Sequence, residues 1–169
     1  YALEYYDVTQ EKMLVEQGEY RFSAGASSAD IRQELECTVS GEVIPPRNLS
    51  HSICIKNYDS KHGIETTLRF SYRKNDWYGC TNDWGGGFTF ADADFAGYTK
   101  AELWAAAPCS QAGVAIYAGE QQLGSVEILP SRSMDDFQLY TIPLKPYTGQ
   151  ADLRLEITGM ASVYRIQLG

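Results

Sequence analysis

Short apolar runs separated by glycines and prolines make up most of this chain. Residues 88–95 alternate apolar and polar side chains with period two, the pattern of a strand with one buried face. Such runs recur at intervals of roughly 8–12 residues, a spacing typical of a two-sheet β-sandwich. The Ala run inside 98–106 would also suit a helix. We predict strands over residues 64–73, 88–95, 98–106, 114–118, 125–129, 137–142, 151–158 and 163–168.

The first 44 residues predict three strands, at about 13–15, 19–24 and 31–39, with Gly18 and Gly25 at the turns. Residues 29–35 would also form a helix, for which Ser28 is a suitable N-cap. So small a segment cannot build a core of its own. We therefore expect it to need further strands or a neighbour to pack on.

The pair Pro45-Pro46 lies between these two regions. Two successive prolines remove two backbone donors and hold the chain extended. We interpret residues 43–48 as a linker.

Charge and length narrow the class of protein. The 169 residues suit one domain, or one domain and a fragment of another. With 14 basic and 22 acidic residues the net charge is -8, which opposes binding to nucleic acid. No window reaches the roughly 18 apolar residues of a membrane helix, so we expect no membrane partner. The sequence begins at Tyr1, and we expect a mature or cut piece of a longer protein, either secreted or from a bacterial cytoplasm.

Cysteine and histidine give no reactive pattern. The four cysteines have no CxxC spacing, allow three disulfide pairings and are expected to be buried free thiols. His51 and His62 form no metal or catalytic motif, and we expect this fragment not to be an enzyme and to need no cofactor or metal. The cysteines are Cys37, Cys54, Cys80 and Cys109.

Aromatic side chains are abundant, with 12 Tyr, 6 Phe and 3 Trp. We expect most of them, Trp104 included, to pack in the core. Trp77 and Tyr78 lie in a polar stretch before Gly79, where both ligand contact and packing stay open. Asn82 could hydrogen-bond a ligand or serve a turn.

The first 46 residues resemble the end of the fibronectin type III-like domain that closes family 3 β-glucosidases. The resemblance rests on residues 3–8, 15–20 and 25–32, the last reading GASSADIR. It implies that residues 31–39 form the final strand of that sandwich, not a helix. It also implies catalytic domains upstream in the same chain.

Residues 47–169 resemble a family 6 carbohydrate-binding module. The resemblance implies a non-catalytic jelly-roll β-sandwich, so the fold expected for the whole chain is all-β. It also implies binding of a plant-type polysaccharide or oligosaccharide, of the β-glucan or xylan class, by aromatic stacking. The matching stretches are 53–65, 78–84, 93–95, 136–140, 152–155 and 162–168.

The resemblance also assigns a sugar cleft among loops at one edge of the sandwich. Tyr78, with Trp77 beside it, would supply the first ring, and Phe137 stands where the family has a second ring, a Trp. Ser162 replaces an Asn that bonds the sugar, and it has a shorter reach and one donor instead of two. Asn82 is a further candidate for hydroxyl contacts.

These departures leave a second function open. A sandwich with a smaller second ring and no Asn could have lost sugar binding, and could instead pack on the catalytic domains or mediate dimerisation. The family's structural calcium is expected to be absent as well. Its ligand positions are Cys54, Lys56 and Tyr164, and a Lys ammonium repels the ion.

Overall fold

The computed structural model describes residues 3–65, 79–81, 85–108 and 110–169. The chain forms two compact units, unit 1 (Tyr1–Pro45) and unit 2 (Pro46–Gly169). Among the described residues there is no α-helix, and no helix is long and apolar enough to cross a membrane.

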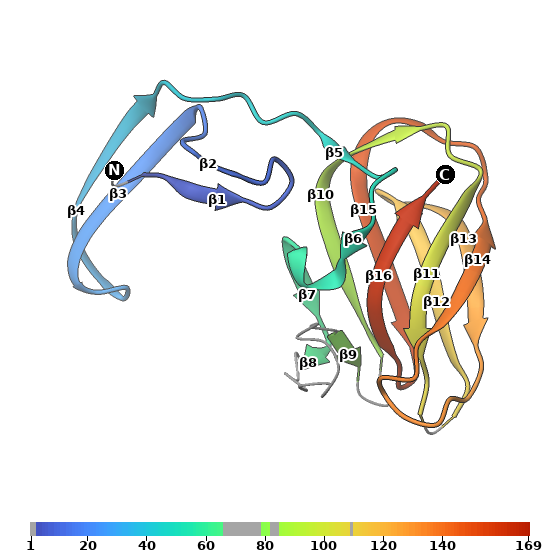
Figure 1. The fold of residues 1–169 in the computed structure, drawn as a ribbon. Coiled ribbons are helices and arrows are strands. Elements are labelled where there is room, and N and C mark those ends of the chain that lie inside the picture. The colour runs from blue at the N-terminus through green and yellow to red at the C-terminus, as the bar shows by residue number, and fades with distance from the viewer. Residues whose placement is uncertain (1–2, 66–78, 82–84, 109) are drawn as a thin grey trace. The chain divides into compact units, whose positions relative to one another are not determined.

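Unit 1 consists of two antiparallel hairpins (Figure 1). Strands β1 (Tyr5–Asp7) and β2 (Lys12–Leu14) pair in the first, and β3 (Gly18–Ser27) and β4 (Asp30–Val39) in the second. The strand prediction for 31–39 is confirmed, because these residues pair with β3 along their whole length and do not form a helix. The described part of unit 1, residues 3–45, therefore has four strands, not the three expected.

The turn predictions at Gly18 and Gly25 are wrong. Gly18 begins β3, and Gly25 lies inside β3 at a β-bulge, where the register shifts on both sides of it. A Cβ at Gly25 would lie 2.0 Å from the carbonyl oxygen of Asp30, so the residue is needed for close strand approach. The chain reverses at residues 28–29 instead.

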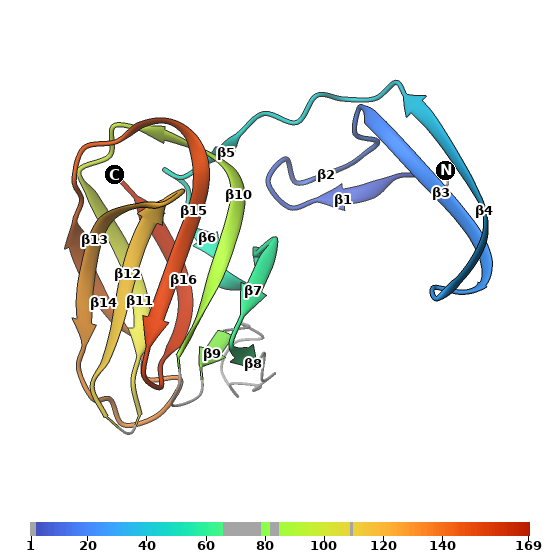
Figure 2. The ribbon, with the colours of Figure 1, turned by 180° about the vertical axis from the view of Figure 1, so that it is seen from behind.

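Unit 2 is a sandwich of two mainly antiparallel sheets, visible face-on from both sides in Figures 1 and 2. Its first sheet has the order β13-β12-β15-β10-β5, with β7 also paired to β10. These strands are β13 (Gln121–Ile128), β12 (Ala112–Ala118), β15 (Thr148–Thr158), β10 (Gly86–Ala96), β5 (Arg47–Asn48) and β7 (Ser60–His62).

The second sheet has the order β14-β11-β16-β9-β8, with β6 also paired to β16. A short 3₁₀ helix, η1 (Ile55–Asn57), follows β6. The strands are β14 (Gln138–Pro143), β11 (Lys100–Ala106), β16 (Ser162–Leu168), β9 (Gly79–Thr81), β8 (Ile64–Glu65) and β6 (Ile53–Cys54). The all-β sandwich prediction is confirmed. Residues 66–73 of the predicted strand 64–73 lie outside the described residues.

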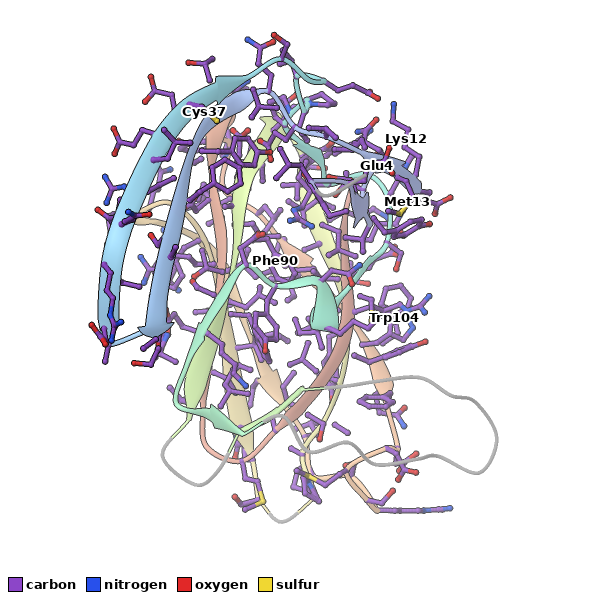
Figure 3. The ribbon with its side chains drawn as sticks, turned by 90° about the vertical axis from the view of Figure 1, so that its left-hand side faces the viewer. Glu4, Lys12, Met13, Cys37, Phe90 and Trp104 are labelled. Atoms are coloured by element: carbon purple, nitrogen blue, oxygen red, sulfur yellow. The ribbon has the colours of Figure 1, made fainter. Side chains whose placement is uncertain are left out.

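Alternation along the strands builds one core between the sheets. In β12 every second residue is buried, from Ala112 to Ala118. Figure 3 shows Phe90 among the side chains between the sheets, and the side chain is fully buried. The Ala run at the end of β11 forms a strand and not the helix that it would also suit. Ala101 and Ala105 alternate with outward residues and are buried in this core. Other fully buried members are Leu49, Ile55, Phe88, Phe95, Leu103, Ile116, Leu123, Ile128, Ile142, Leu153 and Leu155.

Trp104 departs from its predicted place in the core. It is half-buried and lies opposite Leu139 of β14 and Arg165 of β16. Since its neighbours Leu103 and Ala105 are buried, period two turns Trp104 to the outer face of the second sheet.

Arg47 anchors β5, the first strand of unit 2, to the rest of the sandwich. Its Nη2 lies 2.9 Å from Asp59 Oδ2, and its guanidinium lies 5.6 Å from the ring centroid of Phe90. Asp59 Oδ2 also accepts a hydrogen bond from the Ala91 amide at 2.7 Å. These contacts join β5 to the middle of β10, so the sandwich begins directly after Pro46.

Replacing Leu155 by Ala should lower the free energy of unfolding by about 2–5 kcal/mol, because it leaves a cavity beside fully buried neighbours. Urea unfolding followed by fluorescence measures the change. The matched control Leu139→Ala removes a side chain that is 53% exposed, and should stay within about 0.5 kcal/mol of the wild type. Equal effects of the two variants would contradict this description of the core.

Candidate functional site

The predicted loop cleft is described only in part. Trp77, Tyr78 and Asn82 lie outside the described residues, so their roles stay predictions. Phe137 and Ser162 are described, and they lie just before β14 and at the start of β16.

Phe137 is part of an aromatic stack. Its ring lies 5.4 Å from that of Tyr164, centroid to centroid, with 29° between the planes. Arg165 Cζ lies 4.3 Å from the centroid of the Tyr164 ring, and its Nη2 donates to the Tyr164 hydroxyl at 2.6 Å. All three side chains are half-buried. The stack gives Phe137 a fixed orientation through the cation–π and ring contacts of its neighbours.

Tyr164 was not predicted as the partner of Phe137. The register of β16 shifts between Val163 and Arg165, so Tyr164 is the extra residue of a bulge. The sequence carries a signal for this, because the apolar residues Val163 and Ile166 are three apart instead of two. A strict period-two reading cannot place Tyr164 and Arg165 on one side.

Ser162 is fully buried, and its hydroxyl donates to Met134 Sδ at 3.4 Å. In this conformation no part of it is exposed to solvent. A sugar would therefore reach the hydroxyl only after neighbouring side chains move. Its predicted contact with a sugar stays a prediction.

The positions expected to bind calcium in the resembling family do not fit that ion here. They carry a thiol, an ammonium and a phenol. Cys54 of β6 is paired with Arg165 of the adjacent strand β16. Calcium takes six to eight oxygen ligands. The hydroxyl of Tyr164 already accepts a hydrogen bond from the guanidinium of Arg165, and a cation there would oppose a second one. Within the described residues, no group of three or more His, Cys, Asp and Glu side chains could hold a metal.

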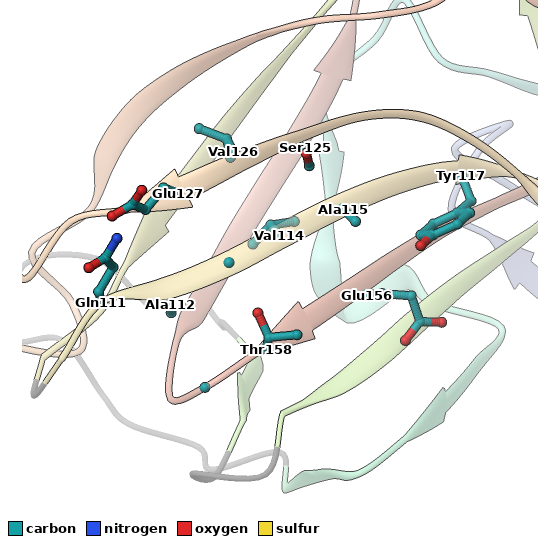
Figure 4. Close-up of a pocket in the computed structure, with 12 residues that line it drawn as sticks. Gln111, Ala112, Val114, Ala115, Tyr117, Ser125, Val126, Glu127, Glu156 and Thr158 are labelled. Carbon is teal, nitrogen blue, oxygen red and sulfur yellow. The ribbon is translucent and has the colours of Figure 1, made fainter.

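A second candidate site lies on the outer face of the first sheet, where Figure 4 shows an open groove along β12 between β13 and β15. Its volume is about 700 Å³. The outward residues of its floor, Gly113 and Ala115 of β12 and Ser125 of β13, are small. Small side chains at three neighbouring positions create the hollow.

Polar and aromatic side chains surround this floor. Tyr117 of β12 lies at one end, and Gln111 precedes β12 at the other (Figure 4). Glu127 of β13 lines one side, and Glu156 and Thr158 of β15 line the other. A groove of this composition offers one ring face, hydroxyl groups, an amide and carboxylates.

A chain of charges runs across the strands beside Tyr117. Arg154 Nη1 donates to Glu120 Oε1 at 2.9 Å, and Nη2 donates to Glu156 Oε1 at 3.0 Å. The hydrogen bond to Glu156 is the largest of the effects that raise the pKa of Arg154 above its ordinary value. The other oxygen of Glu156, Oε2, lies 3.1 Å from His62 Nε2. Glu156 is therefore held from two sides.

Sequence reasoning missed this groove. Glu156 and His62 are neighbours only because both lie beside Gly87 in the sheet register. The one local signal is the small outward pair of Gly113 and Ala115 in an otherwise apolar strand. Such a pair identifies a hollow only when the residues on the adjacent strands are known.

Comparison with known proteins matches the sandwich to solved structures. No protein-family model and no curated protein matches the chain. A family 6 carbohydrate-binding module from Clostridium stercorarium, in complex with cellobiose, is 19% identical with a TM-score of 0.66, covering 75% of this chain and 98% of that module. A β-1,3-glucan-binding family 6 module from Bacillus halodurans is 18% identical with a TM-score of 0.64, covering 72% and 96%.

A third match is the module of Cellvibrio mixtus lichenase 5A in complex with cellotriose, at 12% identity and a TM-score of 0.60, covering 72% of this chain and 97% of that module. Unit 2 has the fold of family 6 carbohydrate-binding modules. At such low identity the likeness concerns the fold, so the chemistry of the two candidate sites has to be argued from this chain's own residues.

Gly87→Ala should separate His62 from Glu156, because a Cβ there would lie 2.5 Å from His62 Cε1 and 2.9 Å from Glu156 Oε2. We expect a loss of about 1–3 kcal/mol of unfolding free energy, measured in urea. Adding His62→Ala to this variant should recover part of the loss. The whole loss should not return, since the Leu155 carbonyl oxygen is also only 2.8 Å away. An unchanged stability of Gly87→Ala would contradict the packing described here.

Proposed function

We propose that unit 2 is a non-catalytic carbohydrate-binding module. The observation that carries this proposal is the groove along β12, which has a floor of small side chains, the Tyr117 ring at one end and hydrogen-bonding groups on both sides. The fold shared with family 6 modules supports it.

The chemistry of the groove suits a neutral sugar chain. A pyranose has apolar C–H faces that pack on a flat ring, and a rim of hydroxyl groups. Glu127, Glu156, Thr158 and Gln111 can accept or donate hydrogen bonds along that rim. Because Arg154 is engaged by two carboxylates, the groove offers little to an anionic ligand.

The ligand class we infer is a polysaccharide or oligosaccharide of the β-glucan or xylan type. Solved modules with this fold are complexes with cellobiose, xylose or cellotriose, and another binds β-1,3-glucan. The loop cleft of Trp77, Tyr78, Phe137, Ser162 and Asn82 remains a second proposed site for the same ligands.

We further infer a parent protein of the family 3 β-glucosidase type, in which unit 1 closes a fibronectin type III-like domain. The sequence resemblance of residues 1–46 is the main support. The β3–β4 hairpin supports it too, because Phe22 (41% exposed) and Leu35 (65% exposed) lie opposite each other on one face. A two-stranded hairpin with an open apolar face is marginal by itself.

The alternative function, packing on other domains, is favoured by one observation. Leu139 is 53% exposed and lies opposite the half-buried Trp104 on the outer face of the second sheet. Adjacent apolar side chains on a surface suit contact with another protein surface.

Isothermal titration of the purified chain should detect binding of cellotetraose, xylotetraose or laminaritetraose. Tyr117→Ala should weaken that binding about tenfold or more, since burying one aromatic side chain against a ligand contributes about 1.5–3 kcal/mol. The control Tyr6→Ala removes an exposed tyrosine of unit 1 and should leave the affinity unchanged.

Phe137→Ala and Tyr78→Ala distinguish the two sites. If these variants lose binding while Tyr117→Ala keeps it, the loop cleft is the sugar site and the groove is not. If no oligosaccharide produces heat with the wild type, the carbohydrate-binding proposal fails and the packing alternative gains.

The same oligosaccharides should remain intact during overnight incubation with the chain, as measured by chromatography of the mixture. Hydrolysis by two carboxylates requires them in a pair about 5–10 Å apart around a glycosidic bond. Glu127→Gln and Glu156→Gln would identify the source of any hydrolysis detected, and hydrolysis that these variants abolish would contradict the non-catalytic proposal.

A further inference from the structure

Arg154 contacts two residues that line the groove, yet it is not itself among the lining residues. Its Cζ lies 5.3 Å from the centroid of the Tyr117 ring, and its Nη2 donates to Glu156 at 3.0 Å. Arg154 lies directly opposite Tyr117 across strands β15 and β12. One side chain therefore controls both the ring and the nearest carboxylate at that end of the groove.

The guanidinium covers one face of the Tyr117 ring. Cation–π contact of this kind fixes a ring that otherwise exchanges between rotamers. Only the other face then remains available for a sugar. Which face is covered decides how a sugar chain would enter the groove.

Glu156 is fixed in the same way. One oxygen accepts from Arg154 and the other lies beside His62, so the carboxylate has one orientation. A carboxylate has about four acceptor positions, and two of them remain for hydroxyl groups. Groups held in place before binding lose less entropy when a ligand arrives.

Arg154 is itself anchored on its far side. Nη1 donates to the Gly119 carbonyl at 3.2 Å and to Glu120 at 2.9 Å, both in the turn that joins β12 to β13. Gly119 has a φ of 55°, which favours glycine in that turn. The planar fork of an arginine reaches all these acceptors at once, whereas a lysine has a single nitrogen.

We propose that Arg154 is a positioning residue that fixes Tyr117 and Glu156 and so sets the glycan affinity of the groove. This inference rests on the proposed function, because it concerns the same groove. It adds a residue that acts through two others without touching the sugar.

The first experiment needs no ligand. Ring signals of ¹³C-labelled tyrosine are recorded by NMR, with Tyr117 assigned through Tyr117→Phe. Arg154→Met should shift the Tyr117 signal, and Arg154→Lys should shift it less. The control Lys100→Met removes a cation that pairs with Glu102 at 3.0 Å on the other sheet, and should leave the Tyr117 signal in place.

The second experiment measures affinity for cellotetraose, xylotetraose and laminaritetraose by calorimetry. Arg154→Met should weaken binding of the tightest of them about three- to tenfold. Arg154→Lys should fall between this variant and the wild type, and Lys100→Met should match the wild type. In the Glu156→Gln background, Arg154→Met should weaken binding less than it does in the wild type, because the ion pair between Arg154 and Glu156 is already lost.

The outcomes separate the two proposals. A shifted Tyr117 signal together with weaker binding supports the inference. Wild-type binding that Arg154→Met and Arg154→Lys leave unchanged overturns it but keeps the proposed function. Absence of wild-type binding to all three sugars overturns both. If Arg154→Met does not fold, as judged by circular dichroism, Arg154→Lys and Glu120→Gln replace it in both experiments. The Glu120 side chain is 96% exposed. Unchanged binding by both of these variants would overturn the inference.

Discussion

Burial of every second side chain between the two sheets is the interaction on which the rest of unit 2 depends. Val114 and Ile116 face the core from β12, so Gly113, Ala115 and Tyr117 must face solvent. A slip of one residue would bury Tyr117 and expose the core, which a sandwich with one apolar layer strongly opposes. The groove therefore exists because the inner layer fixes the strand register.

Much of the sandwich could be predicted from period two and from glycine and proline positions. The predicted strands over 88–95, 114–118 and 151–158 are confirmed because one of their faces is apolar and buried. Prediction failed where that rule is interrupted. Gly25 lies in a bulge and not at a turn, and Tyr164 becomes a partner of Phe137 only through a bulge in β16.

The sites were harder to predict because they depend on register between distant segments. Residues 62, 87 and 156 become neighbours through β7, β10 and β15, and no local pattern contains this information. Family resemblance predicted Phe137 as a sugar contact, but not the Phe137–Tyr164–Arg165 stack that orients it. In unit 1 the strand over 31–39 was predicted, but its pairing with β3 and the separate β1–β2 hairpin were not.

The floor of the groove is almost bare backbone at Gly113 and Ala115. Ala115 faces solvent, so enlarging it would not disturb the packed layer beneath. A Cβ at Gly113 would lie 2.6 Å from Thr158 Oγ1, so a larger residue there would also displace the Thr158 side chain. Each added methylene would make the groove shallower and shorten the chain length it can admit. Evolution could thus retune ligand preference at Ala115, and at Gly113 together with Thr158, while the inner layer of the sandwich stays as it is.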